Sequence, residues 1–287
     1  MPMITLKRRI LHGFAICAGL LFWTVGAHAE TVVNGATLLR GGAVEGGLMI
    51  ARTAPDSRVT LDDAAIPVAP DGLFIVGFHR DSDLPVTIGI TKTDGTSQLT
   101  VLTPQQRSYQ IQRIDGLQKN MVTPPENVIA RIKSDQAAVA AARQTPAAAG
   151  DFWRGIDWPV TGRISGVFGS QRILNGQPRQ PHYGIDIAAP TGTPVYAPAS
   201  GLVTLVKDLY FSGWTVVLAH GLGVNSSFLH LDRVDVETGM MVERGGLIGT
   251  IGATGRATGP HLDWRIDWQG RRIDPGLLVG AMPDPAT

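Results

Sequence analysis

The sequence predicts an all-β protein, and three observations support this fold class. Of the 287 residues, 35 are glycine and 19 are proline, and only 17% are charged, which is typical of short strands joined by tight turns. Runs of β-branched and aromatic residues recur along the chain, for example at 48–53 and 214–219. Turn sequences such as Asp94-Gly95 separate these runs. We expect two β domains joined by a short helical linker.

The first 29 residues have the composition of a secretory signal peptide. Basic residues at 7–9 precede an apolar stretch over 10–26, and Ala29 ends a small-x-small sequence. We expect cleavage after Ala29 and a periplasmic or secreted mature protein; a retained membrane anchor is the alternative. Cys17, the single cysteine, would leave with this segment. No later run is long enough to span a bilayer, so we expect no integral membrane segment after cleavage.

The charge balance argues against nucleic acid as a partner. The chain has 25 basic and 24 acidic residues, and loss of the first 29 residues leaves 22 basic against 24 acidic. Neither side of Gly150 has a basic excess, which nucleic-acid-binding domains usually carry. We therefore expect no nucleic-acid partner.

The composition divides the mature chain into three parts. Residues 30–115 contain strand-like runs and no cluster of histidines or paired carboxylates, so we expect a small β-sandwich with a structural or recognition role. Residues 116–150 begin a helical pattern after Pro124 and become rich in alanine, which indicates a helix that fades into a flexible linker. Residues 151–287 are rich in glycine and strands, and they hold four of the five histidines of the mature chain.

Two short segments of this last part carry residues that can bind a metal. His182-Tyr-Gly-Ile-Asp186 is expected to be extended, because its apolar residues alternate and Gly184 disfavours a helix, so His182 and Asp186 would project to one side. His261 and Asp263 are two residues apart in a predicted strand and would also share a face. Zinc takes nitrogen and oxygen ligands of these kinds, although either motif alone also suits a surface strand.

Two further histidines lie in apolar surroundings. His230 lies within the apolar run 228–231, where a histidine is more often a buried structural residue than a catalyst. His220 precedes a turn at Gly221, and we expect a structural role for it. Three histidine-bearing strands in one domain nevertheless favour a shared site.

From Trp158 to Pro275 the chain resembles the M23 family of zinc metallopeptidases, also called the LytM or lysostaphin-type peptidoglycan endopeptidases. The blocks that carry the resemblance are the domain opening at 158–169, the His-x-x-x-Asp motif at 182–186, and the segments 192–198, 228–231 and 249–262, the last leading into the family's His-x-His motif. The resemblance implies a LytM-like open antiparallel sheet with a groove. Residues 30–115 resemble the β-rich N-terminal domain of some secreted members.

The resemblance also implies a role for each candidate residue. His182 and Asp186 would be zinc ligands, and His261 would be the general base that activates the attacking water. His230 would orient that water or stabilise the oxyanion. The family's third ligand is the second histidine of His-x-His, and here that position is Asp263. Aspartate is an acceptable zinc ligand, but two carboxylates would cancel the formal charge of the ion and make it a weaker Lewis acid.

The function implied is that of a secreted zinc metalloendopeptidase, with Zn²⁺ as cofactor, that hydrolyses peptide cross-links of bacterial peptidoglycan. The alternative is a catalytically degenerate relative that binds peptidoglycan or activates another wall hydrolase. A sugar-cleaving wall enzyme would need two carboxylates placed about a glycosidic bond, and the sequence offers no such pair. Either of the first two functions allows a regulatory protein partner, and the N-terminal domain would position the substrate or cover the groove.

Overall fold

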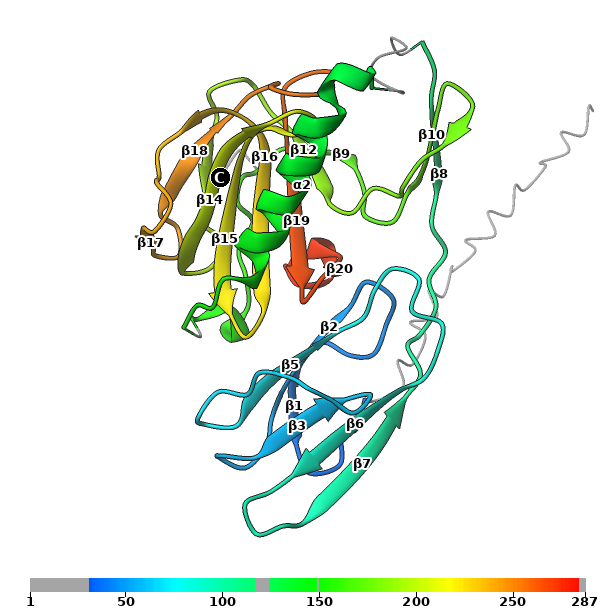
Figure 1. Ribbon diagram of the computed structural model, residues 1–287, viewed down its shortest axis with the longest axis vertical. Coiled ribbons are helices and arrows are strands. Elements are labelled where there is room, and N and C mark those ends of the chain that lie inside the picture. Colours follow the sequence, from blue (N-terminus) through cyan, green and yellow to red (C-terminus); the bar gives the residue numbers. More distant parts are fainter. Residues whose placement is uncertain (1–30, 117–123, 149, 284–287) are drawn as a thin grey trace, which may run out of the picture. The chain divides into compact units, whose positions relative to one another are not determined.

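The computed structural model describes residues 31–116, 124–148 and 150–283 (Figure 1). Strands dominate, and α2 is the α-helix of these ranges, so the predicted all-β class is confirmed. The predicted signal peptide lies outside the described residues. Within the described ranges, no helix is long and apolar enough to cross a membrane.

The N-terminal strands form two small antiparallel sheets with the orders β1-β2-β5 and β4-β3-β6-β7. β2 and β5 are buried along almost their whole length, as expected of strands covered on both faces. The predicted turn at Asp94-Gly95 joins β6 to β7. These strands pair without a register shift, from Val86 opposite Leu102 to Thr91 opposite Ser97. The strands are β1 (Thr37–Arg40), β2 (Leu48–Arg52), β3 (Arg58–Leu61), β4 (Ala64–Ala65), β5 (Leu73–Gly77), β6 (Val86–Thr91) and β7 (Ser97–Leu102).

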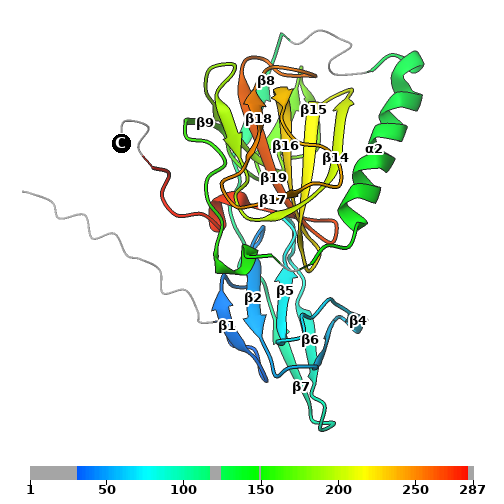
Figure 2. The same cartoon turned by 90° about the vertical axis from the view of Figure 1, so that its left-hand side faces the viewer.

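The predicted helical pattern after Pro124 forms a helix. A 3₁₀ turn, η1 (Glu126–Val128), leads into α2 (Ile129–Gln144), which includes the first five alanines of the alanine-rich stretch and ends before Pro146. Alanine has the highest intrinsic helix propensity, and packing of α2 against β14 and β15 adds to it (Figure 2). Buried Asp135 anchors the helix by accepting a hydrogen bond from the Tyr210 backbone N at 2.9 Å.

The C-terminal part contains an open antiparallel sheet of order β17-β14-β15-β16-β19-β12-β9, which confirms the predicted architecture. Three further strands extend this sheet: β18 pairs with β16 and with β13, and β20 pairs with β19. The elements are η2 (Phe152–Arg154), β9 (Arg163–Gly166), β10 (Gln171–Leu174), β11 (Gln177–Pro178), β12 (Ile185–Ala188), β13 (Pro194–Tyr196), β14 (Gly201–Leu209), β15 (Gly213–Gly221), β16 (Val224–Val234), β17 (Met241–Val242), β18 (Leu247–Ile251), β19 (His261–Trp268), β20 (Arg271–Ile273) and η3 (Pro275–Leu277).

The two-residue period of β19 separates the core from the polar face of the sheet. Leu262 and Trp264 are fully buried, and each such side chain contributes about 1.5–3 kcal/mol of hydrophobic stabilisation. His261, Asp263 and Arg265 alternate with them and therefore lie on the opposite face. The apolar half of the strand thus fixes the register that presents the polar half.

A small separate sheet joins strands that are distant in sequence. β8 (Ile111–Ile114) pairs in parallel with β10, and β10 pairs with β11 (Figure 1). β8 falls within the predicted 30–115 part, whereas β10 falls within 151–287. This small sheet is therefore built from chain segments on both sides of α2, and the domain boundaries at 30–115, 116–150 and 151–287 stay a prediction.

Candidate metal centre

Two carboxylates face each other across neighbouring strands of the large sheet. Asp186 in β12 is the register partner of Asp263 in β19, and both side chains are buried. Like charges at opposed positions destabilise a strand pair unless cations compensate them. Buried His182 precedes β12, and one potential ligand atom from each of these three residues lies within 4.8 Å of the others. The sequence motifs therefore converge on one point.

His182 and Asp186 carry donor atoms that no described protein group satisfies. Both ring nitrogens of His182 and the Oδ1 atom of Asp186 are buried without a hydrogen-bond partner. The Nε2 atom of His182 and the Oδ1 atom of Asp186 lie 3.0 Å apart but form no hydrogen bond with each other. Buried polar atoms normally have partners, and one imidazole with carboxylates is a donor set that zinc accepts. The residues present therefore fit a zinc ion.

Two glycines make room for the carboxylates. A Cβ atom at Gly184 would lie 2.5 Å from Asp263 Oδ1, and one at Gly166, the register partner of Asp186, would overlap Asp186 Oδ2. Neither glycine has a positive φ angle, so space rather than backbone conformation requires them. The glycine of the His-Tyr-Gly-Ile-Asp segment thus contributes to the site directly.

Each carboxylate is also paired with an arginine that the motif analysis missed. Arg265 donates from Nε to Asp263 Oδ1 at 2.9 Å and from Nη2 to Oδ2 at 2.5 Å. Arg172 in β10 donates to Asp186 Oδ2 at 3.1 Å. The two-residue alternation of β19 indicates that Arg265 lies on the same face as Asp263, which it follows by two residues. Arg172 comes from a separate strand, and no local pattern indicates it.

The arginine beside Asp263 changes the electrostatics of the site. Burial alone would raise the pKa of the Asp263 carboxyl, but the charges of Arg265 and His182 and the hydrogen bonds from Arg265 outweigh burial and hold that pKa well below its usual range. Ionised Asp263 and Arg265 together carry zero formal charge, which equals that of the neutral imidazole in the family's His-x-His motif. The pair therefore avoids the cancellation of the metal ion's charge that two unpaired carboxylates would cause.

His261 and His230 lie beside this group, each held by one ring nitrogen. Because a carbonyl only accepts, Nδ1 of His261 donates to Gly259 O at 2.8 Å, and Nδ1 of His230 donates to Thr254 O at 2.7 Å. In the neutral rings this tautomer leaves Nε2 as an acceptor. The Nε2 atom of His261 is 3.8 Å from Asp186 Oδ1, and the two ring centroids are 4.8 Å apart.

The backbone at His230 is unusual. Its φ angle is 65°, in the left-handed region that residues other than glycine rarely occupy. The pairing of β16 with β15 shifts register here, which marks a bulge, and bulges re-aim side chains near functional sites. Burial lowers the pKa of His230 although Asp263 and the Thr254 carbonyl oppose this. His230 is thus a neutral imidazole turned toward the site rather than a core-filling residue.

One cavity of about 650 Å³ unites these groups. Its lining includes the five candidate site residues of the sequence analysis, His182, Asp186, His230, His261 and Asp263. His220 is not among the lining residues.

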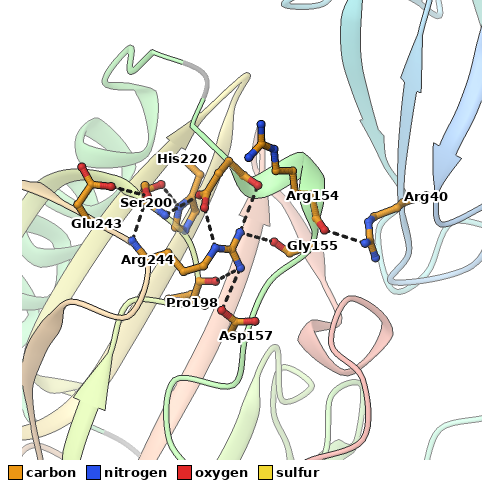
Figure 3. Close-up of polar contacts among 10 residues, drawn as sticks. Arg40, Arg154, Gly155, Asp157, Pro198, Ser200, His220, Glu243 and Arg244 are labelled. Carbon is orange, nitrogen blue, oxygen red and sulfur yellow. Dashed lines mark hydrogen bonds and ion pairs between the residues drawn. The ribbon is translucent and has the colours of Figure 1, made fainter.

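His220 belongs to a separate polar cluster (Figure 3). Its Nδ1 donates to the Ser200 carbonyl oxygen at 2.9 Å, so its Nε2 accepts from the buried Ser226 hydroxyl at 2.8 Å. The ring also stacks on Phe152, with centroids 5.4 Å apart. These contacts agree with the structural role expected for it.

The stability of the fold is predicted to depend on pH through His220. Burial lowers its pKa to about 4, below the ordinary 6.5, so only the unfolded chain binds a proton in that interval. The stabilisation is therefore present above pH 6.5, falls as the pH falls, and is lost by about pH 4, a change of about 3 kcal/mol. Urea unfolding at pH 7 and pH 4.5 should show a smaller pH-dependent loss for His220→Gln than for the wild type. Equal losses in the two proteins would refute this.

With the geometry established, comparison with known proteins identifies the family. Residues 180–275 match peptidase family M23. The crystal structure described as "putative peptidase M23" from Pseudomonas aeruginosa is 30% identical, with a TM-score of 0.67, over 85% of this chain and 97% of that chain. The chain belongs to the M23 peptidase family. The predicted family resemblance is therefore confirmed.

Curated relatives of this M23 chain include enzymes of the bacterial wall. Peptidoglycan DD-endopeptidase ShyA of Vibrio cholerae is 40% identical over 113 residues, which are 39% of this chain and 26% of that protein. An uncharacterized metalloprotease of Haemophilus influenzae is 37% identical over 120 residues, 41% of this chain and 22% of that protein. The chain thus spans about a quarter of the length of these relatives.

Proposed function

We propose that the protein is a zinc metalloendopeptidase that hydrolyses peptide cross-links of bacterial peptidoglycan. The observation that carries the proposal is the buried group of His182, Asp186 and Asp263, in which His182 and Asp186 have buried polar atoms without a hydrogen-bond partner. Membership of the M23 family and the likeness to a peptidoglycan DD-endopeptidase support the substrate class.

In the proposed reaction, His182, Asp186 and Asp263 hold the metal ion. Zinc held there would supply a Lewis acid for the scissile carbonyl and would make the attacking water more acidic. His261 accepts the proton of the attacking water at Nε2, since its Nδ1 is held by Gly259, and then delivers it to the leaving amine.

His230 has one of the two roles that the family resemblance allows. Its only ring proton is donated to the Thr254 carbonyl, and burial keeps the ring neutral, so Nε2 has no proton to offer to an oxyanion. Nε2 can accept a hydrogen bond from the attacking water instead. We therefore assign His230 to orienting the water.

A second candidate function is a catalytically degenerate relative that binds peptidoglycan or activates another hydrolase. One observation favours it: Arg172 and Arg265 pair with the two carboxylates, so the charge of the site is balanced without an ion. Such a protein would bind the wall without cutting it. A regulatory protein partner is compatible with both functions.

We also propose that the protein acts outside the cytoplasm, in the periplasm or as a secreted protein. The basic, apolar and small-x-small regions of residues 1–29 support export, and peptidoglycan lies outside the cytoplasmic membrane. N-terminal sequencing of the exported protein tests cleavage after Ala29, since a retained Met1 would indicate an anchor.

Digestion of isolated peptidoglycan tests the proposed reaction. The mature chain from Glu30, incubated with zinc and purified sacculi, should convert cross-linked muropeptides into monomers with new amino and carboxyl termini, as measured by mass spectrometry. A chelator should stop the conversion. Unchanged cross-links together with sedimentation of the protein on the sacculi would contradict hydrolysis and support the degenerate binder.

A further inference from the structure

The bulge that carries His230 is held by two loops. The backbone N of His230 donates to the Ser212 carbonyl oxygen at 2.8 Å, in the hairpin between β14 and β15. Its ring Nδ1 lies 2.7 Å from the carbonyl oxygen of Thr254, in the connection between β18 and β19. The φ angle of 65° is unfavourable for a residue with a side chain and persists only where its surroundings enforce it. The position of the His230 ring therefore depends on residues outside β16.

The Thr254 hydroxyl joins β15 and β16 next to the bulge. Trp214 and Leu231 are register partners beside the register shift between these strands. The Trp214 backbone N donates to Thr254 Oγ1 at 3.0 Å, and Thr254 Oγ1 donates to the Leu231 carbonyl oxygen at 2.8 Å. One hydroxyl thus accepts from one strand and donates to the other. An alkyl side chain at residue 254 could do neither.

Gly213 gives the Thr254 side chain room to reach both strands. A Cβ atom at residue 213 would overlap Thr254 Oγ1, and the φ angle of 60° at this residue also disfavours a side chain. Thr254 therefore packs closely on the Gly213 backbone in addition to its two hydrogen bonds. These contacts fix residue 254, and with it the carbonyl group that faces the His230 ring.

The Thr254 carbonyl determines which ring nitrogen of His230 carries the proton. A carbonyl oxygen only accepts, so Nδ1 of the neutral ring is protonated and Nε2 keeps its lone pair. The His230 side chain lines the cavity beside His261, with the two ring centroids 4.8 Å apart. Without a fixed carbonyl, the ring would also adopt the other tautomer, which presents a proton at Nε2 where the attacking water needs an acceptor.

We propose that Thr254 is a positioning residue for the reaction, because its hydroxyl holds the carbonyl that keeps Nε2 of His230 an acceptor for the attacking water. The inference rests on the proposed function, since it explains how the water-orienting role assigned to His230 is maintained. Thr254 is not in the described lining of the cavity, so it acts through His230 rather than on the substrate.

Ring tautomers measured by nitrogen NMR test the proposal without turnover. In the mature chain labelled with isotopic histidine, the His230→Gln variant identifies the His230 signals. We expect the proton on Nδ1 in the wild type, a substantial population protonated on Nε2 in Thr254→Val, and the wild-type tautomer in Thr254→Ser, which keeps the hydroxyl. With a purified cross-linked muropeptide as substrate, Thr254→Val should lower kcat about tenfold at unchanged KM, and Thr254→Ser should retain most of the rate.

Thr193→Val is the matched control, because it removes a hydroxyl that donates to the Pro190 carbonyl oxygen at 2.7 Å, outside the cavity lining. It should change neither the tautomer nor kcat. Protonation of Nε2 in the wild type would overturn the inference even if Thr254→Val does not fold, and so would equal losses of kcat in Thr254→Val and Thr254→Ser.

The same measurements separate this inference from the proposed function. A His230 tautomer that responds to Thr254→Val, in a protein that leaves peptidoglycan intact, would contradict the hydrolase and support the positioning role. A working hydrolase whose tautomer and kcat are unchanged in Thr254→Val would overturn the positioning role alone.

Discussion

Asp263→Ala is expected to abolish zinc binding and peptidoglycan hydrolysis and also to destabilise the fold. The substitution removes one of three proposed ligands. It also leaves the guanidinium of Arg265 without its ion-pair partner, because Arg265 donates two hydrogen bonds to the Asp263 carboxylate. Asp263 is buried but the Arg265 side chain is 28% exposed, so the loss should be smaller than the cost of about 3–5 kcal/mol for a fully buried pair, because water can solvate part of the remaining charge. Metal analysis and urea unfolding measure the two effects separately.

The control variants separate the ligand role of Asp263 from its pairing role. Asp263→His restores the family's ligand type but still leaves Arg265 without a carboxylate partner. This variant should therefore bind zinc and remain destabilised. Asp263→His combined with Arg265→Gln should bind zinc and recover most of the lost stability. Asp235→Ala breaks the exposed Arg233–Asp235 pair and should cost at most about 1 kcal/mol. Unchanged zinc content in Asp263→Ala would show that the third ligand is another residue.

His261→Ala is expected to keep the metal and lose the reaction. The His261 side chain lies beside the ligand group with Nε2 as its free acceptor, but it is not one of the three proposed ligands. Loss of a general base lowers turnover by about 10²–10⁴-fold while ligands and fold remain. Zinc content, thermal unfolding and the rate of release of muropeptide monomers should be measured on one preparation. Loss of zinc with loss of activity would make His261 a ligand, and an unchanged rate would remove it from the mechanism.

The fold was largely predictable because its information is local. Alternating residues in β19, turn residues such as Asp94-Gly95 and the ordered motif blocks each depend on neighbours in sequence. The helical pattern after Pro124 predicted the start of α2, whereas the length of α2 depends on its packing against the distant strands β14 and β15. The parallel pairing of β8 with β10 joins segments about 60 residues apart, and no local pattern specifies it.

The site was predictable in its residues and less so in its electrostatics. The motifs identified His182, Asp186 and Asp263, and the structure brings them together. The arginine partners of the two carboxylates were missed, because motif matching treats each ligand position alone. The bulge at His230 was also missed, because its register shift results from pairing with a neighbouring strand. Electrostatic compensation is a property of the assembled sheet rather than of any single segment.

The central claim is that His182, Asp186 and Asp263 together hold one zinc ion. The most direct measurement is the zinc content of the purified mature chain and of His182→Ala, by plasma mass spectrometry after dialysis against metal-free buffer. We predict one zinc ion per wild-type chain and none in the variant, because His182 is the only imidazole among the proposed ligands. A zinc-free wild type, alongside a zinc-loaded Asp263→His, Arg265→Gln double variant, would contradict the claim and identify a degenerate binder.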